Sequence, residues 1–300
     1  FAAIYAVLAN VFYIFTVIKS KMLNAGASIA HAGFGIMILG MLISSANKEV
    51  ISNSRVNGIT LPSAKDPKVK NPEDPRENLT LIRQVPTRMG SYEVTYVKDS
   101  SGHEKGRNFY ELQFIKKDSS DNSIAESFIL NPDVYLMKDN NLSSNPDTRS
   151  YLTKDVFTYI SYALNKDKNE DTAQFNIVEL QEQDSSFYSN GYVILNGVVK
   201  NPNNTRYQYK PTDVALMADL TIVSKDGNRY KAFPLIEVDT LGIKQIDDTL
   251  YAQNLYLRFA GISDDHKIKL GIKESDQFID FVAVKAYVFP FINLVWLGLI

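Results

Sequence analysis

The sequence predicts a membrane protein in which transmembrane α-helices flank an all-β extracytoplasmic domain, an antiparallel barrel or sandwich. All 34 acidic residues lie between Glu49 and Asp280, which leaves both ends of the 300-residue chain apolar. The middle holds many short runs with the alternation of half-buried strands, separated by turn residues. The chain has no Cys and a formal net charge of −2, which excludes disulfides, thiolate metal sites and a global basic field for nucleic acid.

Residues 1–46 predict two transmembrane helices with a cytoplasmic connector. At ~1.5 Å per residue, the second apolar run, Ala25 to Ala46, spans roughly 33 Å, about the thickness of a bilayer's hydrocarbon core. Lys19 and Lys21 between the two runs favour the cytoplasmic side. A signal peptide is the alternative for the first run, Phe1 to Ile18, but this run lacks a positive n-region and is followed by another span.

Residues 47–284 form the predicted extracytoplasmic domain, which begins with a Pro-rich linker at 52–77. Alternating or β-branched runs predict strands at 79–85, 92–97, 109–115, 156–162, 191–195, 214–223, 230–238, 255–259 and 278–284. Residues 285–300 then predict the start of a third transmembrane helix. Its aromatic residues are expected near the outer membrane interface as anchors: Tyr287, Phe289, Phe291 and Trp296.

His31 is the one titratable residue inside the second predicted span. A titratable side chain within a membrane is costly and as a rule faces the protein interior with a function. On a helix, Ala27, His31 and Gly35 share one face, which predicts a shallow bay beside the imidazole. Ser28, one turn before His31, could bond the other ring nitrogen. This arrangement suits axial ligation of haem iron by His31.

A row of glycines, Gly26, Gly33 and Gly40, recurs at every seventh residue of the same span. Small residues let a neighbouring helix approach closely, so this row predicts a helix contact. His31 itself has two open interpretations. It is either a haem ligand or an intramembrane histidine that is hydrogen-bonded to a partner helix.

Two membrane-flanking motifs carry a family resemblance. Ala30-His31-Ala32-Gly33 in a glycine-rich span, and the closing segment Tyr287-Val-Phe-Pro-Phe-Ile-Asn-Leu-Val-Trp-Leu-Gly298, together resemble the C-terminal part of the CcmF-type haem lyase subunit of cytochrome c maturation. Weaker similarities lie at 128–135 and 153–159. Phe289 and Asn293 stand where the family often has basic residues, and Trp296 is the only Trp, so the family's tryptophan-rich haem motif is not in this sequence.

The resemblance implies a haem lyase subunit that holds a transmembrane b-type haem and helps attach haem covalently to apocytochrome c. His31 would be an axial ligand of the haem iron, with Ala27, Gly35 and Ser28 around it. The implied partners are apocytochrome c, a haem chaperone and a thiol-presenting maturation subunit. The implied location is the bacterial inner membrane, multi-pass, with the large domain on the periplasmic side. No catalytic residue is assigned.

Two alternatives stay open. The first is a membrane-anchored extracytoplasmic β-domain that binds or senses a partner without a cofactor. The second keeps haem but assigns the chain to the other bacterial haem export and ligation route. A loop metal site at His103 or His266 is conceivable, but single histidines in polar turns are usually solvated.

Overall fold

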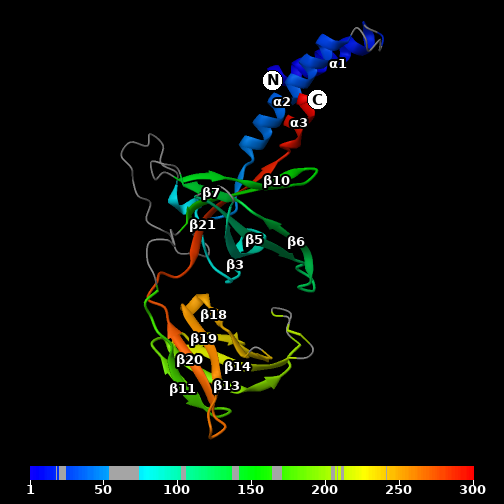
Figure 1. Cartoon of the computed structure of the whole chain (residues 1–300). Coiled ribbons are helices and arrows are strands. Elements are labelled where there is room, and N and C mark those ends of the chain that lie inside the picture. The colour runs from blue at the N-terminus through cyan, green and yellow to red at the C-terminus, as the bar shows by residue number, and fades with distance from the viewer. Residues whose placement is uncertain are drawn as a thin grey trace. The chain divides into compact units, whose positions relative to one another are not determined.

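The structure, a computed structural model, describes residues 1–17, 19, 25–53, 74–102, 106–136, 142–163, 171–203, 207, 209–210, 213–240 and 242–300. The chain is a mostly antiparallel β protein whose described strands form four sheets, with apolar helices towards its ends (Figure 1). It divides into two compact units. The first unit comprises Phe1–Leu81, Pro86–Ala163 and Phe281–Ile300, and the second comprises Ile82–Val85 and Leu164–Asp280. The β-rich region expected at 47–284 thus contains two β units.

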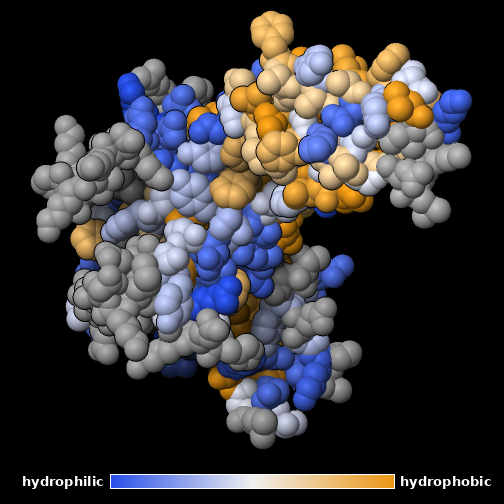
Figure 2. All heavy atoms as spheres, turned by 90° about the horizontal axis from the view of Figure 1, so that it is seen from above, coloured by the Kyte–Doolittle hydropathy of each residue, from blue (hydrophilic) through white to orange (hydrophobic). Residues whose placement is uncertain are grey.

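The helices belong to the first unit: α1 (Ala2–Thr16), α2 (Gly26–Ala46) and α3 (Asn293–Leu299). α2 packs against both α1 and α3 (Figure 1). Seen from above, apolar side chains gather over the helices (Figure 2). Among the described residues, α2 is the one helix long and apolar enough to cross a membrane, and α1 is shorter. An apolar helix near the N-terminus is typical of a signal sequence or a single anchor, so the multi-pass arrangement stays a prediction.

Two antiparallel sheets enclose the core of the first unit. The first sheet has β21 between β1 and β10, with β9 beside β10 and β2 also paired to β21. Its strands are β1 (Glu49–Val50), β2 (Leu79–Ile82), β9 (Asp147–Ser150), β10 (Lys154–Ala163) and β21 (Phe281–Pro290). The second sheet has the strand order β3-β4-β5-β7-β8, with β6 paired to β5. Its strands are β3 (Thr87–Met89), β4 (Tyr92–Ser101), β5 (Arg107–Lys117), β6 (Ile124–Leu130), β7 (Asp133–Leu136) and β8 (Leu142–Asn145).

The core between these sheets is built from alternate residues of the strands. Val94, Tyr96 and Phe114 come from the second sheet, and Val156 and Val284 come from the first. Each of these side chains is fully buried. The alternation that predicted strands at 92–97 and 156–162 is therefore the in–out pattern of β4 and β10.

β21 corrects the predicted boundary of the last helix. Residues 285–290, expected to open a transmembrane helix, are strand, and α3 begins only at Asn293. Residues 282–288 are all buried, and β21 pairs with β10 from Val282 to Pro290. The apolar run is continuous because this part of β21 is covered on both faces.

The second unit also holds two antiparallel sheets around one core. The first has the order β11-β20-β19-β18, and the second has the order β12-β13-β14-β16-β17, with β15 paired to β14. The strands are β11 (Asn176–Leu180), β12 (Ser185–Tyr188), β13 (Gly191–Lys200), β14 (Val214–Ser224), β15 (Arg229–Ala232), β16 (Leu235–Asp239), β17 (Gly242–Ile246), β18 (Asp248–Leu250), β19 (Leu255–Ile262) and β20 (Ile268–Glu274). Leu195, Leu220 and Phe259 are among its fully buried core residues.

Two predicted connections fall partly outside the described residues. The structure does not describe residues 54–73 of the Pro-rich linker or residues 20–23 of the predicted cytoplasmic connector. The end of the linker, Pro75–Glu77, forms one turn of 3-10 helix, η2, directly before β2. His103 also lies outside the described residues.

Candidate functional site

α2 carries the predicted haem ligand, and its two neighbours occupy distinct faces of the helix. A Cβ atom added at Gly33 would lie 2.6 Å from the carbonyl oxygen of Gly298, and one at Gly40 would lie 2.7 Å from the backbone nitrogen of Val295, both in α3. The prediction that Gly33 and Gly40 admit a neighbouring helix is confirmed. At Gly26, no described atom lies within 4 Å of the added Cβ.

The other neighbour, α1, lies against Gly35. A Cβ added there would come within 2.8 Å of Val7 Cγ2 and 3.0 Å of the carbonyl oxygen of Ala3. α1 therefore occupies the space beside Gly35 where the sequence predicted an open bay. Ala27 and His31, the other two residues of that predicted face, are exposed.

Ser28, which was expected to bond the other ring nitrogen of His31, is buried, with 7% of its surface exposed. The structure thus separates the four proposed haem-site residues into two groups. His31 and Ala27 face away from α1 and α3, whereas Ser28 and Gly35 are covered. The imidazole is the exposed titratable group of a mostly apolar helix, and it is available to a ligand or a further helix.

No other described residues assemble a metal site. Among the residues that the structure describes, no group of three or more His, Asp or Glu side chains is placed to hold a metal ion. His266 sits in the turn between β19 and β20 with a φ of 60°, and its backbone N–H donates to the carbonyl of Ser263 at 3.0 Å. This is a tight-turn position rather than a ligand position.

A buried charged cluster in the first unit was missed by the sequence analysis. Lys285 in β21 is only 1% exposed, and its Nζ lies 3.8 Å from Glu77 Oε2. Tyr287 donates its hydroxyl hydrogen to the same carboxylate oxygen at 3.0 Å, and Lys48 Nζ lies 4.5 Å from the centre of the Tyr287 ring. Tyr287, expected at the membrane interface, is instead a buried strand residue. The signal in the sequence is Lys285 itself, a single charge within an apolar strand.

Four aromatic rings line the face of β10 and β21 that points away from the core. Phe157 contacts Tyr159 and Phe289 at ring-centre distances of 6.1 and 5.9 Å, and Tyr287 contacts Tyr159 and Phe289 at 6.4 and 6.0 Å. The pairing of Phe157 with Tyr287 places the rings on one face. Phe157, Tyr159 and Phe289 of this face are partly exposed, whereas Tyr287 is buried.

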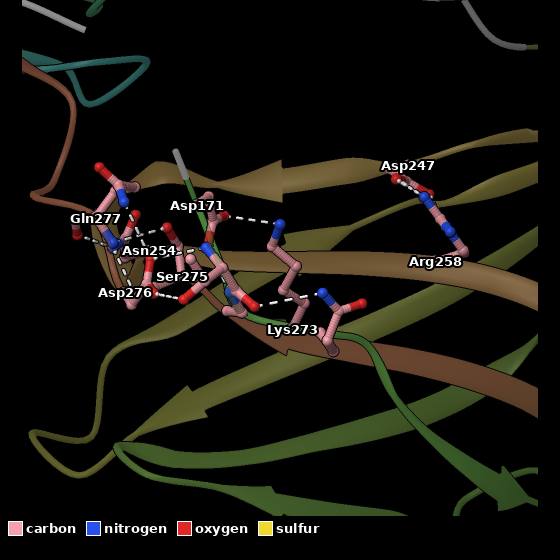
Figure 3. A network of polar contacts seen from close by, with 11 residues as sticks. Asp171, Asp247, Asn254, Arg258, Lys273, Ser275, Asp276 and Gln277 are labelled. Carbon is pink, nitrogen blue, oxygen red and sulfur yellow. Dashed lines mark hydrogen bonds and ion pairs between the residues drawn. The ribbon is translucent and has the colours of Figure 1, made fainter. Parts of the chain in front are cut away.

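The second unit holds a polar network at the end of β20 (Figure 3). Lys273 Nζ lies 2.7 Å from Asp171 Oδ2. Burial raises the pKa of Asp171, but hydrogen bonds from Lys273 and from the backbone N–H of Ala173 outweigh burial and lower it to about 2. Asn254 Nδ2 donates to the carbonyls of Ser275 and Gln277 at 3.1 and 2.7 Å. The network ties the segment that enters β11 to the turn after β20, and its role is structural.

Comparisons with known proteins give no further guidance. No family model, no curated protein and no solved structure matches the chain. A functional assignment therefore rests on the residues of this chain.

Proposed function

We propose that the chain is part of a cytochrome c maturation haem lyase of the CcmF type, in which α2 holds a transmembrane b-type haem through His31. The observation that carries the proposal is the position of the imidazole. His31 is exposed on an apolar helix whose other faces are taken by α1 and α3 through Gly35, Gly33 and Gly40. Packing against the two described helices therefore leaves this face of α2 unused.

The chemistry favours a ligand at this face. An imidazole in contact with acyl chains would lose its hydrogen bonds to water, which costs a few kcal/mol. Coordination of haem iron by one ring nitrogen removes part of that cost, and the apolar surface of α2 suits the macrocycle. Ala27, one turn before His31, adds no bulk that would hold a flat ligand away from the helix.

In this proposal the haem is a redox cofactor, and His31 acts as a ligand rather than as an acid or base. His31 would hold the haem, and the chemistry that a bound b-type haem would supply is electron transfer during the covalent attachment of haem to apocytochrome c. The β units would lie on the periplasmic side of the inner membrane and contact apocytochrome c, the haem chaperone or the thiol-presenting maturation subunit.

The test is the b-haem content of the full-length protein after His31→Ala. We expect the pyridine haemochrome signal of the purified variant to fall at least about tenfold, because loss of an axial ligand weakens haem binding by more than ~1.4 kcal/mol. Imidazole added to His31→Gly should restore part of the absorption. His266→Ala, which removes an exposed histidine from a turn of the second unit, is the matched control and should keep its haem. A His31→Ala protein with unchanged b-haem absorption would refute the proposal.

A second candidate is a membrane-anchored binding or sensing module without a cofactor. The aromatic face of β10 and β21 favours it, because strand pairing holds three partly exposed rings, those of Phe157, Tyr159 and Phe289, close together. This candidate predicts a colourless full-length protein. The haemochrome spectrum of the wild type therefore separates the two candidates.

A further inference from the structure

A pocket of about 460 Å³ opens in the first unit where its sheets approach the helices. Its lining includes Glu49, Tyr92, Lys154, Val288 and Phe291. The volume falls in the range of small-molecule sites, ~300–1,000 Å³, and the mouths of β-barrels are common places for such sites. The proposed haem function does not use this pocket.

Strand register brings two opposite charges to one side of this pocket. Glu49 of β1 pairs with Val288, and Lys154 of β10 pairs with Pro290. Paired residues project to the same face of a sheet, and β1 and β10 lie on the two sides of β21. The backbones of Glu49 and Lys154 are therefore two strand spacings apart across the sheet and two residues apart along β21, which makes their separation roughly 12 Å. Neither side chain forms an ion pair within the described part of the chain, and Lys154 Nζ lies 5.5 Å from the centre of the Tyr151 ring.

Phe291 of the pocket and Leu152, next to the pocket residue Thr153, are exposed apolar residues joined to the helices. The turn between β9 and β10 presents Leu152, which is 90% exposed, and Phe291 beside it in the chain's path to α3 is 50% exposed. Asn293 Nδ2 at the start of α3 donates to the carbonyl of Leu152 at 2.9 Å, and the N–H of Phe291 donates to the carbonyl of Thr153 at 2.7 Å. These bonds fix two large exposed apolar side chains at the end of an apolar helix, where a membrane surface would meet the β unit.

We propose that this pocket binds the headgroup of a phospholipid with a phosphoethanolamine headgroup. Lys154 would contact the phosphate, Glu49 would accept hydrogen bonds from the ammonium group, and Leu152 and Phe291 would lie beside the acyl chains. One cation and one anion on the same face match a zwitterion, whereas a purely anionic headgroup would be repelled by Glu49. The proposal depends on membrane anchoring by α2 and is independent of haem at His31.

The test uses the full-length protein in nanodiscs that contain equal amounts of phosphatidylethanolamine and phosphatidylglycerol. After the protein is released from the nanodiscs, native mass spectrometry counts the lipids that stay bound to it. We expect one retained phosphatidylethanolamine per chain, in at least about tenfold preference to phosphatidylglycerol. Glycerophosphoethanolamine, which has the same headgroup without acyl chains, should bind at least about tenfold more weakly than the lipid. Equal retention of both lipids, or equal binding of the soluble headgroup, would overturn a phospholipid as the occupant.

Substitutions of Lys154 and Glu49 test the role of each charge in lipid binding. Lys154→Ala should reduce retention about tenfold, Lys154→Arg should preserve it because the positive charge remains, and Glu49→Gln should abolish the preference for phosphatidylethanolamine. Lys200→Ala, an exposed strand-end lysine of the second unit, is the matched control and should bind like the wild type. Wild-type lipid selectivity in both Lys154→Ala and Glu49→Gln would contradict the assignment, and the wild-type measurements decide the proposal even if a variant fails to fold.

Discussion

Asp133 joins three strands of the first unit, and its replacement by Asn should weaken that unit locally. The carboxylate accepts hydrogen bonds from Arg107 Nε and Nη2 of β5 at 2.9 and 3.1 Å and from Asn145 Nδ2 of β8 at 2.8 Å. Burial raises the pKa of Asp133, but the hydrogen bonds from Arg107 and Asn145 outweigh burial and hold it below its usual range. Asp133→Asn preserves the shape but removes the charge and one acceptor oxygen.

The size of the effect follows from the exposure of the two partners. Breaking a buried ion pair costs ~3–5 kcal/mol. The Asp133 side chain is 8% exposed, but that of Arg107 is 33% exposed, so water replaces part of the lost interaction. We therefore expect a loss of ~2 kcal/mol. Since this is about a 30-fold change in an equilibrium constant, amides of β5 and β7 should exchange about 30 times faster.

Hydrogen exchange of the full chain, followed by mass spectrometry of peptides from β5 and β7, measures this directly. Asp247→Asn is the matched control, because Arg258 Nε and Nη2 bind that carboxylate at 2.8 and 2.8 Å in the second unit. Both partners there are about one-third exposed, at 34% and 28%, so its effect should stay below ~1 kcal/mol. Unchanged exchange in β5 and β7 of Asp133→Asn would refute the reasoning.

Three further predictions concern acid sensitivity and helix packing. Folding lowers the pKa of Asp133, so its contribution to the stability of the first unit is complete above its unfolded pKa of ~3.9. The difference in hydrogen-exchange rate between the wild type and Asp133→Asn should therefore shrink as the pH falls below that value. Asp171, whose pKa is about 2, likewise loses its stabilising effect as the pH falls. The protection of β20 from hydrogen exchange should therefore decrease between pH ~4 and ~2. Lys273→Met should reduce this dependence on pH, as measured by hydrogen exchange at a series of pH values. An added Cβ at Gly40 would lie 2.7 Å from the backbone nitrogen of Val295 in α3. Gly40→Val should therefore push α3 away from α2 and speed the hydrogen exchange of α3, whereas Gly26→Val, where no described atom lies within 4 Å of the added Cβ, is the control. Unchanged exchange of α3 in Gly40→Val would contradict the α2–α3 contact.

The alternation of apolar residues was enough to predict several central strands, but it missed the interior strands β7 and β20 and the polar edge strand β9. β4 and β10 lie where Tyr92, Val94 and Val156 mark every second position. β9, with the sequence Asp-Thr-Arg-Ser, is polar throughout, and it pairs only with β10 at the sheet edge. Such a strand owes its conformation to its partner, so its own sequence carries no pattern.

The predicted helix boundary and haem face show the same dependence on tertiary contacts. Phe281 to Pro290 reads as apolar sequence because β21 is covered on both faces, and hydropathy alone cannot separate such a strand from the helix that follows. Along α2, apolar and small residues occur on all sides, so the sequence could not show that α1 would cover Gly35 while His31 stayed exposed. The contacts of particular glycines decide this, and they require the coordinates of the neighbouring helices.

The short joints between the helices and the first sheet have a mechanical consequence. Two residues separate α2 from β1, two separate β21 from α3, and β1 and β21 are hydrogen-bonded to each other at Glu49 and Val288. Such joints contain too little slack to absorb a tilt of one helix relative to the other. A tilt of α2 would strain the hydrogen-bonded pairing of β1 and β21. Ligand binding at His31 that reorients α2 would therefore shear these two strands against each other.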